Sequence, residues 1–249
     1  QEPKLTEDAQ MNEGEVSSVL GLRGWPKVAE EAIIARDVLL AEHVGARLHV
    51  CHLSTAGSVE IVRWAKSRGI SVTAEVTPHH LLLTDETARS YNPVYKVNPP
   101  LRTEDDVMAL RAAIADGTID IVATDHAPHP SEDKECEWSA AAFGMVGLET
   151  ALPVINTTMV KSGLINWSDV ARVMSHKPAE IGRVETHGNE IAVGQPANIV
   201  LFDPETKVMV DRNDTASKSN NNPFHEMELL GRIALTMLRG KTTFKAEWI

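Results

Sequence analysis

Cysteine is scarce in this chain of 249 residues, where only Cys51 and Cys136 occur. Two cysteines cannot build a disulfide framework, and these two form no Cys-x-x-Cys pair of the kind that holds structural zinc. The sequence also lacks an apolar run long enough to cross a membrane and shows no secretion signal. These absences predict a protein of a reducing, cytoplasmic compartment.

Basic residues are in the minority, with 24 Lys and Arg against 35 Asp and Glu and a formal net charge of −11. Such a charge repels the phosphates of nucleic acids and the surface of an anionic membrane. We therefore predict neither as a partner. A small anionic substrate held at a local site remains compatible with this charge.

Helical and strand patterns alternate through the first half of the chain. Apolar residues recur at helical spacing over residues 26–44, with Pro26 at the first helical position and Gly45 after the last. Strands are predicted at residues 47–53, 70–76 and 119–124, and helices at 54–68 and 103–115. This alternation predicts a parallel α/β layer. Residues 1–24 show little periodicity and are expected to form a loop.

The second half begins with helices expected at about 146–161 and 167–181. From Gly194 the pattern changes to short antiparallel strands, predicted at residues 197–202, 207–210 and 241–248. A boundary near residue 190 divides the chain into predicted domains at 1–190 and 191–249. Three parallel strands cannot close a barrel and would leave two exposed edges. We therefore expect the later part of a larger fold, a retained fragment of one, or half of an assembly.

Side chains able to bind metal or move protons stand at the ends of the three predicted parallel strands. They are His52 at the first strand, His79 and His80 at the second, and Asp125, His126 and His129 at the third. The carboxyl ends of parallel strands meet on one face, and histidine with carboxylate suits Zn²⁺. A zinc-dependent hydrolase site fits the joint pattern. A turn-capping aspartate with structural or solvated histidines also fits, and the residues alone leave both readings open.

Several long motifs resemble the type I dihydroorotases of the amidohydrolase superfamily over almost the whole chain. Through the first part these are residues 11–14 (MNEG), 52–55 (HLST), 77–81 (TPHHL), 97–102 (VNPPLR), 124–129 (TDHAPH) and 143–144 (FG). Later motifs are residues 194–201 (GQPANIVL), 218–219 (KS), 222–224 (NPF) and 239–241 (RGK). Hydantoinases and allantoinases share the barrel but typically differ at the PHH and NPPLR segments.

The resemblance implies an α/β fold: the later part of a (β/α)8 TIM-type barrel, strands six to eight, plus a small C-terminal β-rich segment of composite-sandwich type. It implies that His52 is a zinc ligand on the sixth strand, and that Asp125 on the eighth strand both binds metal and moves the proton. One or two zinc ions are expected per site. The family's upstream ligands are absent from this sequence, and two protein ligands fall short of the three usual for catalytic zinc.

The resemblance also implies substrate-binding residues. Asn98 and His129 match side chains that hold the substrate's ring and carboxylate, and the backbone of Phe143 and Gly144 matches a segment that binds the ring. The remaining histidines of the motifs match no metal ligand and are interpreted as supporting or packing groups.

The implied reaction interconverts N-carbamoyl-L-aspartate and (S)-dihydroorotate in pyrimidine biosynthesis. Two alternatives remain: another cyclic amidase of hydantoinase or allantoinase type, and a non-catalytic homologue that serves as a scaffold for aspartate carbamoyltransferase. A homodimer or a complex with that carbamoyltransferase is the expected assembly. Because upstream ligands are missing, residues 1–249 alone are expected to be inactive.

Overall fold

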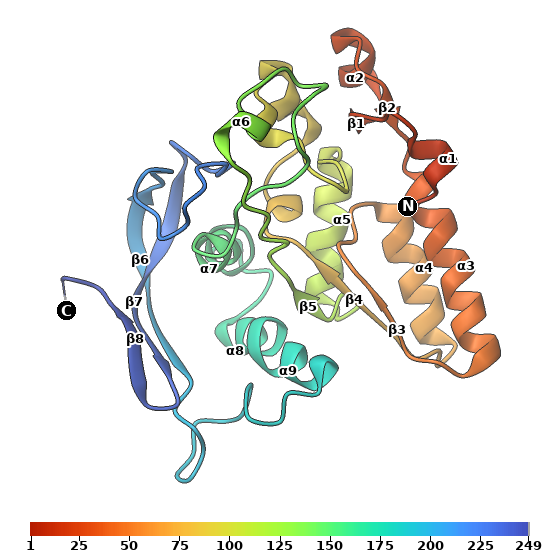
Figure 1. Cartoon of the computed structure of the whole chain (residues 1–249). Coiled ribbons are helices and arrows are strands. Elements are labelled where there is room, and N and C mark those ends of the chain that lie inside the picture. The colour runs from red at the N-terminus through yellow and green to blue at the C-terminus, as the bar shows by residue number, and fades with distance from the viewer. Residues whose placement is uncertain (249) are drawn as a thin grey trace.

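The computed structural model describes residues 1–248, and Figure 1 shows the arrangement of its elements. The helices are α1 (Pro3–Thr6), α2 (Glu15–Leu20), α3 (Val28–Val44), α4 (Ala56–Ser67), α5 (Glu104–Ala115), α6 (Ser131–Lys134), α7 (Ala151–Ile155), α8 (Trp167–Ala171) and α9 (Lys177–Gly182). Short 3₁₀ turns are η1 (His79–Leu81), η2 (Asp85–Ser90) and η3 (Pro93–Tyr95), and π-helical turns are η4 (Asn156–Val160) and η5 (Arg172–His176). The strands are β1 (Met11–Asn12), β2 (Gly24–Trp25), β3 (Leu48–Val50), β4 (Val72–Val76), β5 (Ile121–Val122), β6 (Ile199–Met209), β7 (Glu228–Leu238) and β8 (Lys241–Lys245).

A three-stranded parallel sheet, ordered β3-β4-β5, lies at the centre of the larger part of the molecule. His49 lies opposite Thr73, and Glu75 lies opposite Ile121. The predicted parallel α/β layer is therefore confirmed. All three strands are shorter than predicted: β3 and β5 are shorter at both ends, and β4 is shorter at its start.

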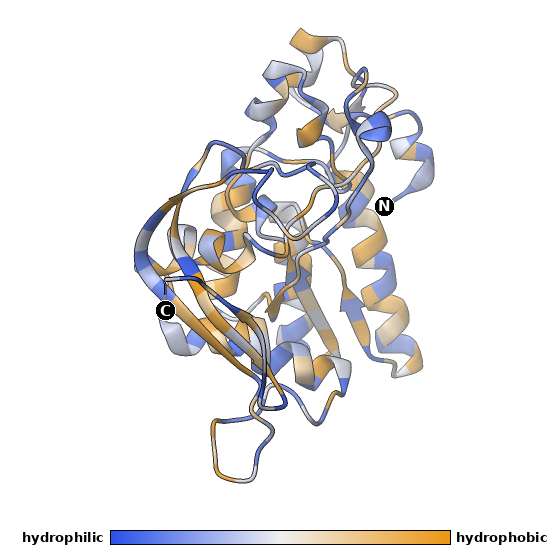
Figure 2. Ribbon diagram, turned by 60° about the vertical axis from the view of Figure 1, so that its left-hand side comes forward, coloured by the Kyte–Doolittle hydropathy of each residue, from blue (hydrophilic) through white to orange (hydrophobic). Residues whose placement is uncertain are grey.

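The two faces of this sheet differ in chemistry. Val72, Ala74 and Val76 of β4 are buried in the main apolar core, together with residues of α3, α4 and α5. Apolar residues in Figure 2 gather where these helices meet the strands. Because side chains alternate along a strand, Thr73 and Glu75 point to the opposite face. That face therefore carries polar groups at the level of the strand ends.

Local capping explains why the helices begin where they do. Thr55 is the N-cap of α4, and its Oγ1 accepts a hydrogen bond from the Ser58 N–H at 3.0 Å. Thr103 is the N-cap of α5 and forms a capping box with Asp106. Oδ1 of Asp106 also accepts from the Ala56 N–H at 3.0 Å, so one carboxylate joins the first turns of both helices.

The prediction of a loop over residues 1–24 is wrong, because α1, α2, β1 and β2 form there. β1 and β2 pair in parallel over only two residues each, which is too short to produce a periodic pattern. Their position depends on distant residues: the Asn12 side chain donates to Asp85 at 2.7 Å and accepts from Arg102 at 3.0 Å.

The C-terminal residues form an antiparallel sheet ordered β6-β7-β8, which lies beyond α7 and α8 in Figure 1. Two predicted strands, 197–202 and 207–210, are one strand, β6, whose register shifts between Asp203 and Lys207. β7 was not predicted, because its long apolar run does not alternate. The helix expected from residue 146 begins at Ala151. None of the helices in residues 1–248 has the length and apolar character needed to cross a membrane.

Candidate active site

His52 and Asp125 follow β3 and β5, and both have left-handed backbone conformations, with φ of 55° and 46°. Residues other than glycine rarely adopt this left-handed conformation. Such strained backbone positions are frequent at functional sites. Continued extension of β3 would direct His52 to the same face as Val50, which packs against the apolar core. The left-handed turn instead brings the His52 ring into contact with Asp125.

His52 lies between two carboxylates. Its Nε2 is 3.6 Å from Asp125 Oδ1, and its Nδ1 is 2.7 Å from Glu75 Oε1. The Nδ1 contact is close but is not aligned as a hydrogen bond, so electrostatic attraction dominates it. Because Glu75 is the nearer carboxylate, a neutral ring with its proton on Nδ1 would leave the Nε2 lone pair free for a metal ion shared with Asp125.

The local charge favours a cation at this edge of the sheet. Contact with Glu75 raises the pKa of His52, burial opposes that rise, and Asp125 reinforces it. Burial raises the pKa of Asp125, the charge of His52 lowers it, and the charge of Glu75 raises it again. Two carboxylates thus share one imidazole, and a bound proton or metal ion would offset their repulsion.

Glu75 is a functional candidate that the motif analysis missed. Burial raises its pKa, but hydrogen bonding to His49 and contact with His52 outweigh burial and lower the pKa to about 2. His49 Nε2 donates to Glu75 Oε2 at 3.0 Å, and its Nδ1 lies 2.7 Å from Thr73 Oγ1. The signal available in the sequence was a carboxylate between Ala74 and Val76 in a buried strand.

Cys51 lies close to this carboxylate. Ligand atoms of His49, Cys51 and Glu75 lie within 4.8 Å of one another, so these residues also form a group that could hold a metal ion. Burial, then the charges of Glu75 and Asp125, raise the pKa of the Cys51 thiol, which disfavours the thiolate needed for ligation. Both ring nitrogens of His49 already have partners, which also weakens this group as a metal site.

The predicted substrate-binding residues His129, Phe143 and Gly144 are brought together. His129 Nε2 lies 2.9 Å from the Phe143 carbonyl oxygen. Gly144 has φ of 144°, and a Cβ there would lie 2.7 Å from His129 Nε2 and 2.7 Å from the Cβ of Ala127. The segment and the imidazole are therefore packed with no room for a side chain. Asn98 is exposed, and within residues 1–248 its side chain makes no hydrogen bond.

The other motif histidines make structural contacts. His79 and His80 are 2% and 1% exposed, and their rings lie 4.6 Å apart. His80 Nδ1 lies 2.7 Å from Thr77 Oγ1. His126 Nδ1 accepts hydrogen bonds from the backbone N–H groups of Gly147 and Leu148. The contacts of His80 and His126 agree with their interpretation as supporting groups, whereas the Nε2 of His79 is buried without a hydrogen-bond partner in residues 1–248.

The donor atoms of His52 and Asp125 fit a shared metal ion. Two ligands about 2.1 Å from a tetrahedral Zn²⁺ lie about 3.4 Å apart. Nε2 and Oδ1 are separated by 3.6 Å. These two residues could therefore occupy neighbouring positions on one ion, and its remaining ligands would have to come from elsewhere.

The fold is of the class seen in the hydantoinases. L-hydantoinase (dihydropyrimidinase) from Arthrobacter aurescens superposes with a TM-score of 0.84 at 34% identity, over 89% of this chain and 50% of that one. A dihydropyrimidinase from Brevibacillus agri shares the fold with a TM-score of 0.83 at 24% identity, over 97% of this chain and 53% of that one.

The chain belongs to the amidohydrolase family, which it matches over residues 28–243. It is 70% identical over 243 residues to a dihydroorotase from Streptomyces coelicolor, covering 98% of this chain and 57% of that protein. It is 54% identical over 243 residues to a dihydroorotase from Mycobacterium tuberculosis, covering 98% of this chain and 56% of that protein. The chain thus spans little more than half the length of these curated relatives.

Proposed function

We propose that this chain is the later part of a (β/α)8 barrel in a zinc-dependent cyclic amide hydrolase, a dihydroorotase of pyrimidine biosynthesis. The observation that carries the proposal is the pairing of His52 Nε2 with Asp125 Oδ1 at 3.6 Å, at the carboxyl edge of the parallel sheet. Similarity to proteins named dihydroorotase supports the choice of substrate. The reaction would interconvert N-carbamoyl-L-aspartate and dihydroorotate.

His52 and Asp125 would hold the zinc ion, with further ligands from the upstream part of the barrel. When bound, zinc supplies Lewis acidity that polarises the amide carbonyl and acidifies the attacking water. Asp125 accepts the proton of that water and delivers it to the ring nitrogen that leaves. The environment suits this task, because burial raises the pKa of Asp125 towards that of a usable base.

The substrate would lie between this pair and the segment that contains Phe143 and Gly144. The Gly144 N–H already donates to the Lys96 carbonyl, so the Phe143 N–H of that segment would bind the ring, and His129 and Asn98 would bind the carboxylate and ring. Exposure of the Asn98 side chain leaves it available for a ligand.

The test is an assay of a protein that carries the complete barrel, with dihydroorotate and hydantoin as competing substrates. Turnover of dihydroorotate supports the proposal, and a preference for hydantoin would identify the other cyclic amidase. Binding to aspartate carbamoyltransferase without turnover of either substrate would identify the scaffold.

Asp125→Asn tests the mechanism. Asparagine keeps the shape and one coordinating oxygen but cannot accept the proton. We expect kcat to fall by about 10²–10⁴-fold, the usual contribution of general base catalysis. His126→Ala is the matched comparison one residue along, because His126 binds backbone N–H groups. If His126→Ala abolishes turnover while Asp125→Asn remains within about tenfold of wild type, the catalytic group is misplaced.

A further inference from the structure

Lys134 is a buried lysine that has no acidic partner among residues 1–248. It is 3% exposed, and its Nζ donates hydrogen bonds to the backbone carbonyls of Lys96 and Ala142, each at 2.8 Å. Lys96 is 2% exposed, and its Nζ donates to the carbonyls of Trp138 and Ser139. Within residues 1–248 neither amine forms an ion pair with a carboxylate.

Burying an ammonium group without a counter-ion is costly, and lysine is almost never fully buried unless it is paired. Burial and the charge of Lys96 lower the pKa of Lys134 to about 7. An apolar side chain of similar length would fill the same volume without this cost. The amine therefore needs a role that only a donor of several hydrogen bonds can perform.

The two carbonyls that Lys134 joins lie on either side of the predicted substrate segment. The Lys96 carbonyl accepts a second hydrogen bond, from the Gly144 N–H at 3.0 Å. Lys96 Nζ lies 4.5 Å above the Phe143 ring. Lys134 thus joins residue 96 to residue 142, directly beside the backbone of Phe143 and Gly144.

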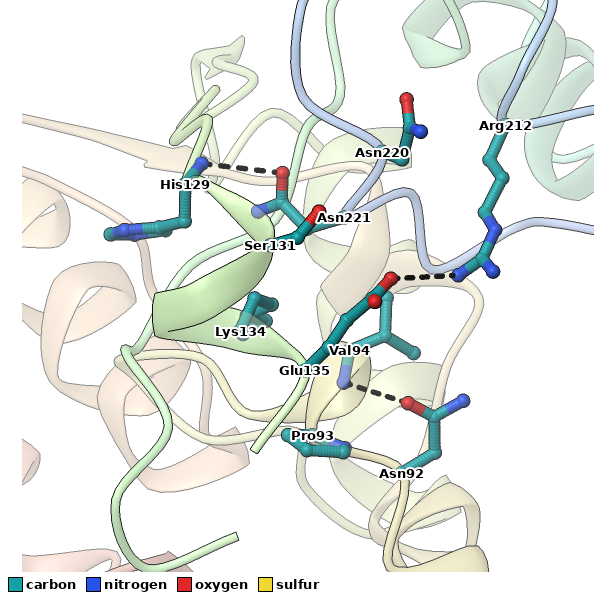
Figure 3. Close-up of a pocket in the computed structure, with 10 residues that line it drawn as sticks. All are labelled: Asn92, Pro93, Val94, His129, Ser131, Lys134, Glu135, Arg212, Asn220 and Asn221. Carbon is teal, nitrogen blue, oxygen red and sulfur yellow. Dashed lines mark hydrogen bonds and ion pairs between the residues drawn. The ribbon is translucent and has the colours of Figure 1, made fainter. Parts of the chain in front are cut away.

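His129 depends on the same segment. Its Nε2 lies 2.9 Å from the Phe143 carbonyl oxygen, and its ring packs against Gly144 with no space for a Cβ. A shift of the segment by an ångström would displace the imidazole too. Figure 3 shows His129 and Lys134 beside a pocket of about 260 Å³, which they line together with Arg212 and Asn221.

We propose that Lys134 is a positioning residue, whose amine fixes the Phe143–Gly144 segment and the His129 imidazole in the geometry that binds the substrate's carboxylate and ring. The proposal rests on the proposed function for the identity of the substrate. The ordering of the segment itself does not depend on that identity.

The decisive variant is Lys134→Met, made in a protein with the complete barrel. Methionine fills the space but donates no hydrogen bond. We expect KM for dihydroorotate to rise about 10- to 100-fold, as misplacement of a binding group by an ångström does, with zinc content unchanged and kcat much less affected. Lys134→Arg keeps the donors, and the neighbouring pocket gives the guanidinium room, so it should recover most of the affinity. Lys161→Met, at an exposed ion pair with Glu205, is the matched control.

Hydrogen exchange gives a readout that does not depend on activity. The Gly144 amide should exchange at least about tenfold faster in Lys134→Met than in wild type, because its acceptor at residue 96 is no longer fixed. If Lys134→Met does not fold, Lys134→Gln replaces it under the same criteria, since its shorter side chain cannot span both carbonyls.

Unchanged KM together with unchanged exchange would overturn the inference, and so would loss of zinc. If wild type fails to turn over dihydroorotate, the proposed function fails, and the exchange of Gly144 alone decides the role of Lys134. If wild type is active and Lys134→Met behaves identically, the positioning role alone fails.

Discussion

At the scale of single residues, Glu75 belongs to none of the sequence motifs, but it contacts His52, which does belong to one. Its two oxygens contact different histidines, His52 at 2.7 Å and His49 at 3.0 Å. A carboxylate that holds the far nitrogen of a ligating histidine fixes the tautomer and strengthens the ligand. If His52 holds the metal ion as proposed, Glu75 would determine which of its nitrogens is available to that ion.

Replacing Glu75 by alanine should weaken metal binding by about 10- to 100-fold, the usual loss when a supporting partner of a ligand is removed. Glu75→Gln retains an oxygen toward His52 and should lose less. The measurement is zinc affinity by competition with a chelator, in a protein with the complete barrel.

His49→Ala is the control for this prediction, because it removes the other partner of Glu75 and leaves His52 in place. It should lower zinc affinity much less than Glu75→Ala does, because His49 is hydrogen-bonded to Glu75 and holds no nitrogen of His52. If His49→Ala and Glu75→Ala lower zinc affinity equally, the cause is a disturbance of the strands and not the loss of the contact between Glu75 and the His52 ring.

His52 and Asp125 could be identified from the sequence because each follows a short strand pattern at the point where polar residues begin. No such sequence signal pointed to Glu75, since a single carboxylate in a strand can equally face solvent. The burial of Lys134 could not be predicted either, because a lysine in a polar loop is normally expected to be exposed. The burial of Glu75 and Lys134 depends on which distant segments pack against them. A local sequence pattern does not contain that information.

At the scale of elements, Asp106 joins three segments. Its Oδ1 accepts from the Ala56 N–H at the start of α4, and its Oδ2 accepts from Thr103 and pairs with Lys27 at 2.6 Å. The side chain is fully buried. Burial raises its pKa, but the hydrogen bonds from Lys27, Thr103 and Ala56 outweigh burial and lower it below 3.8.

Asp106→Asn should lower the free energy of unfolding by about 1–3 kcal/mol at pH 7, because one oxygen that accepts hydrogen bonds is replaced by a donor. Because the pKa of Asp106 is lowered in the folded state, its contribution to the free energy of unfolding decreases as the pH falls. The stabilisation is complete above the unfolded value near 3.8 and is lost as the pH falls through the folded pKa. Urea titrations should therefore show the gap between wild type and variant closing below pH 4. A gap that stays constant down to pH 2 would mean that the ion pair contributes nothing.

The elements that the sequence predicted well are those with their own start and stop signals. α3 ends at Gly45, which adopts the left-handed conformation, and α5 begins at the Thr103 capping box. β1 and β2 were missed because each is two residues long and held by side chains from distant positions. β7 was missed because its apolar run could also be a helix, and only pairing with β6 and β8 decides between them.

At the scale of the whole molecule, β3 forms an edge of the parallel sheet. Within residues 1–248 it pairs only with β4, and the chain covers 57% and 56% of the two dihydroorotases named above. The polar face that carries His49 and Glu75 continues to this edge. An upstream strand would both pair with β3 and bring further ligands to the site.

Residues 1–249 expressed alone are therefore expected to bind zinc weakly and to show no dihydroorotase turnover. The reason is that His52 and Asp125, the two proposed ligands, would fall short of the three that a catalytic zinc usually has. The measurement is an intact mass near 27.2 kDa followed by zinc titration and an assay. Robust turnover by a chain verified at that mass would show that the strand assignment is wrong.

The left-handed backbone at His52 and Asp125 also affects which substitutions would stabilise the fold at these two positions. Each such conformation costs about 1–3 kcal/mol for a residue with a side chain, and glycine would relieve most of that cost. A lineage that no longer needed chemistry at this edge would gain stability by accepting glycine at either position. An imidazole and a carboxylate at these two facing positions therefore carry a stability cost that a site for metal-dependent chemistry would require and that a scaffold would not.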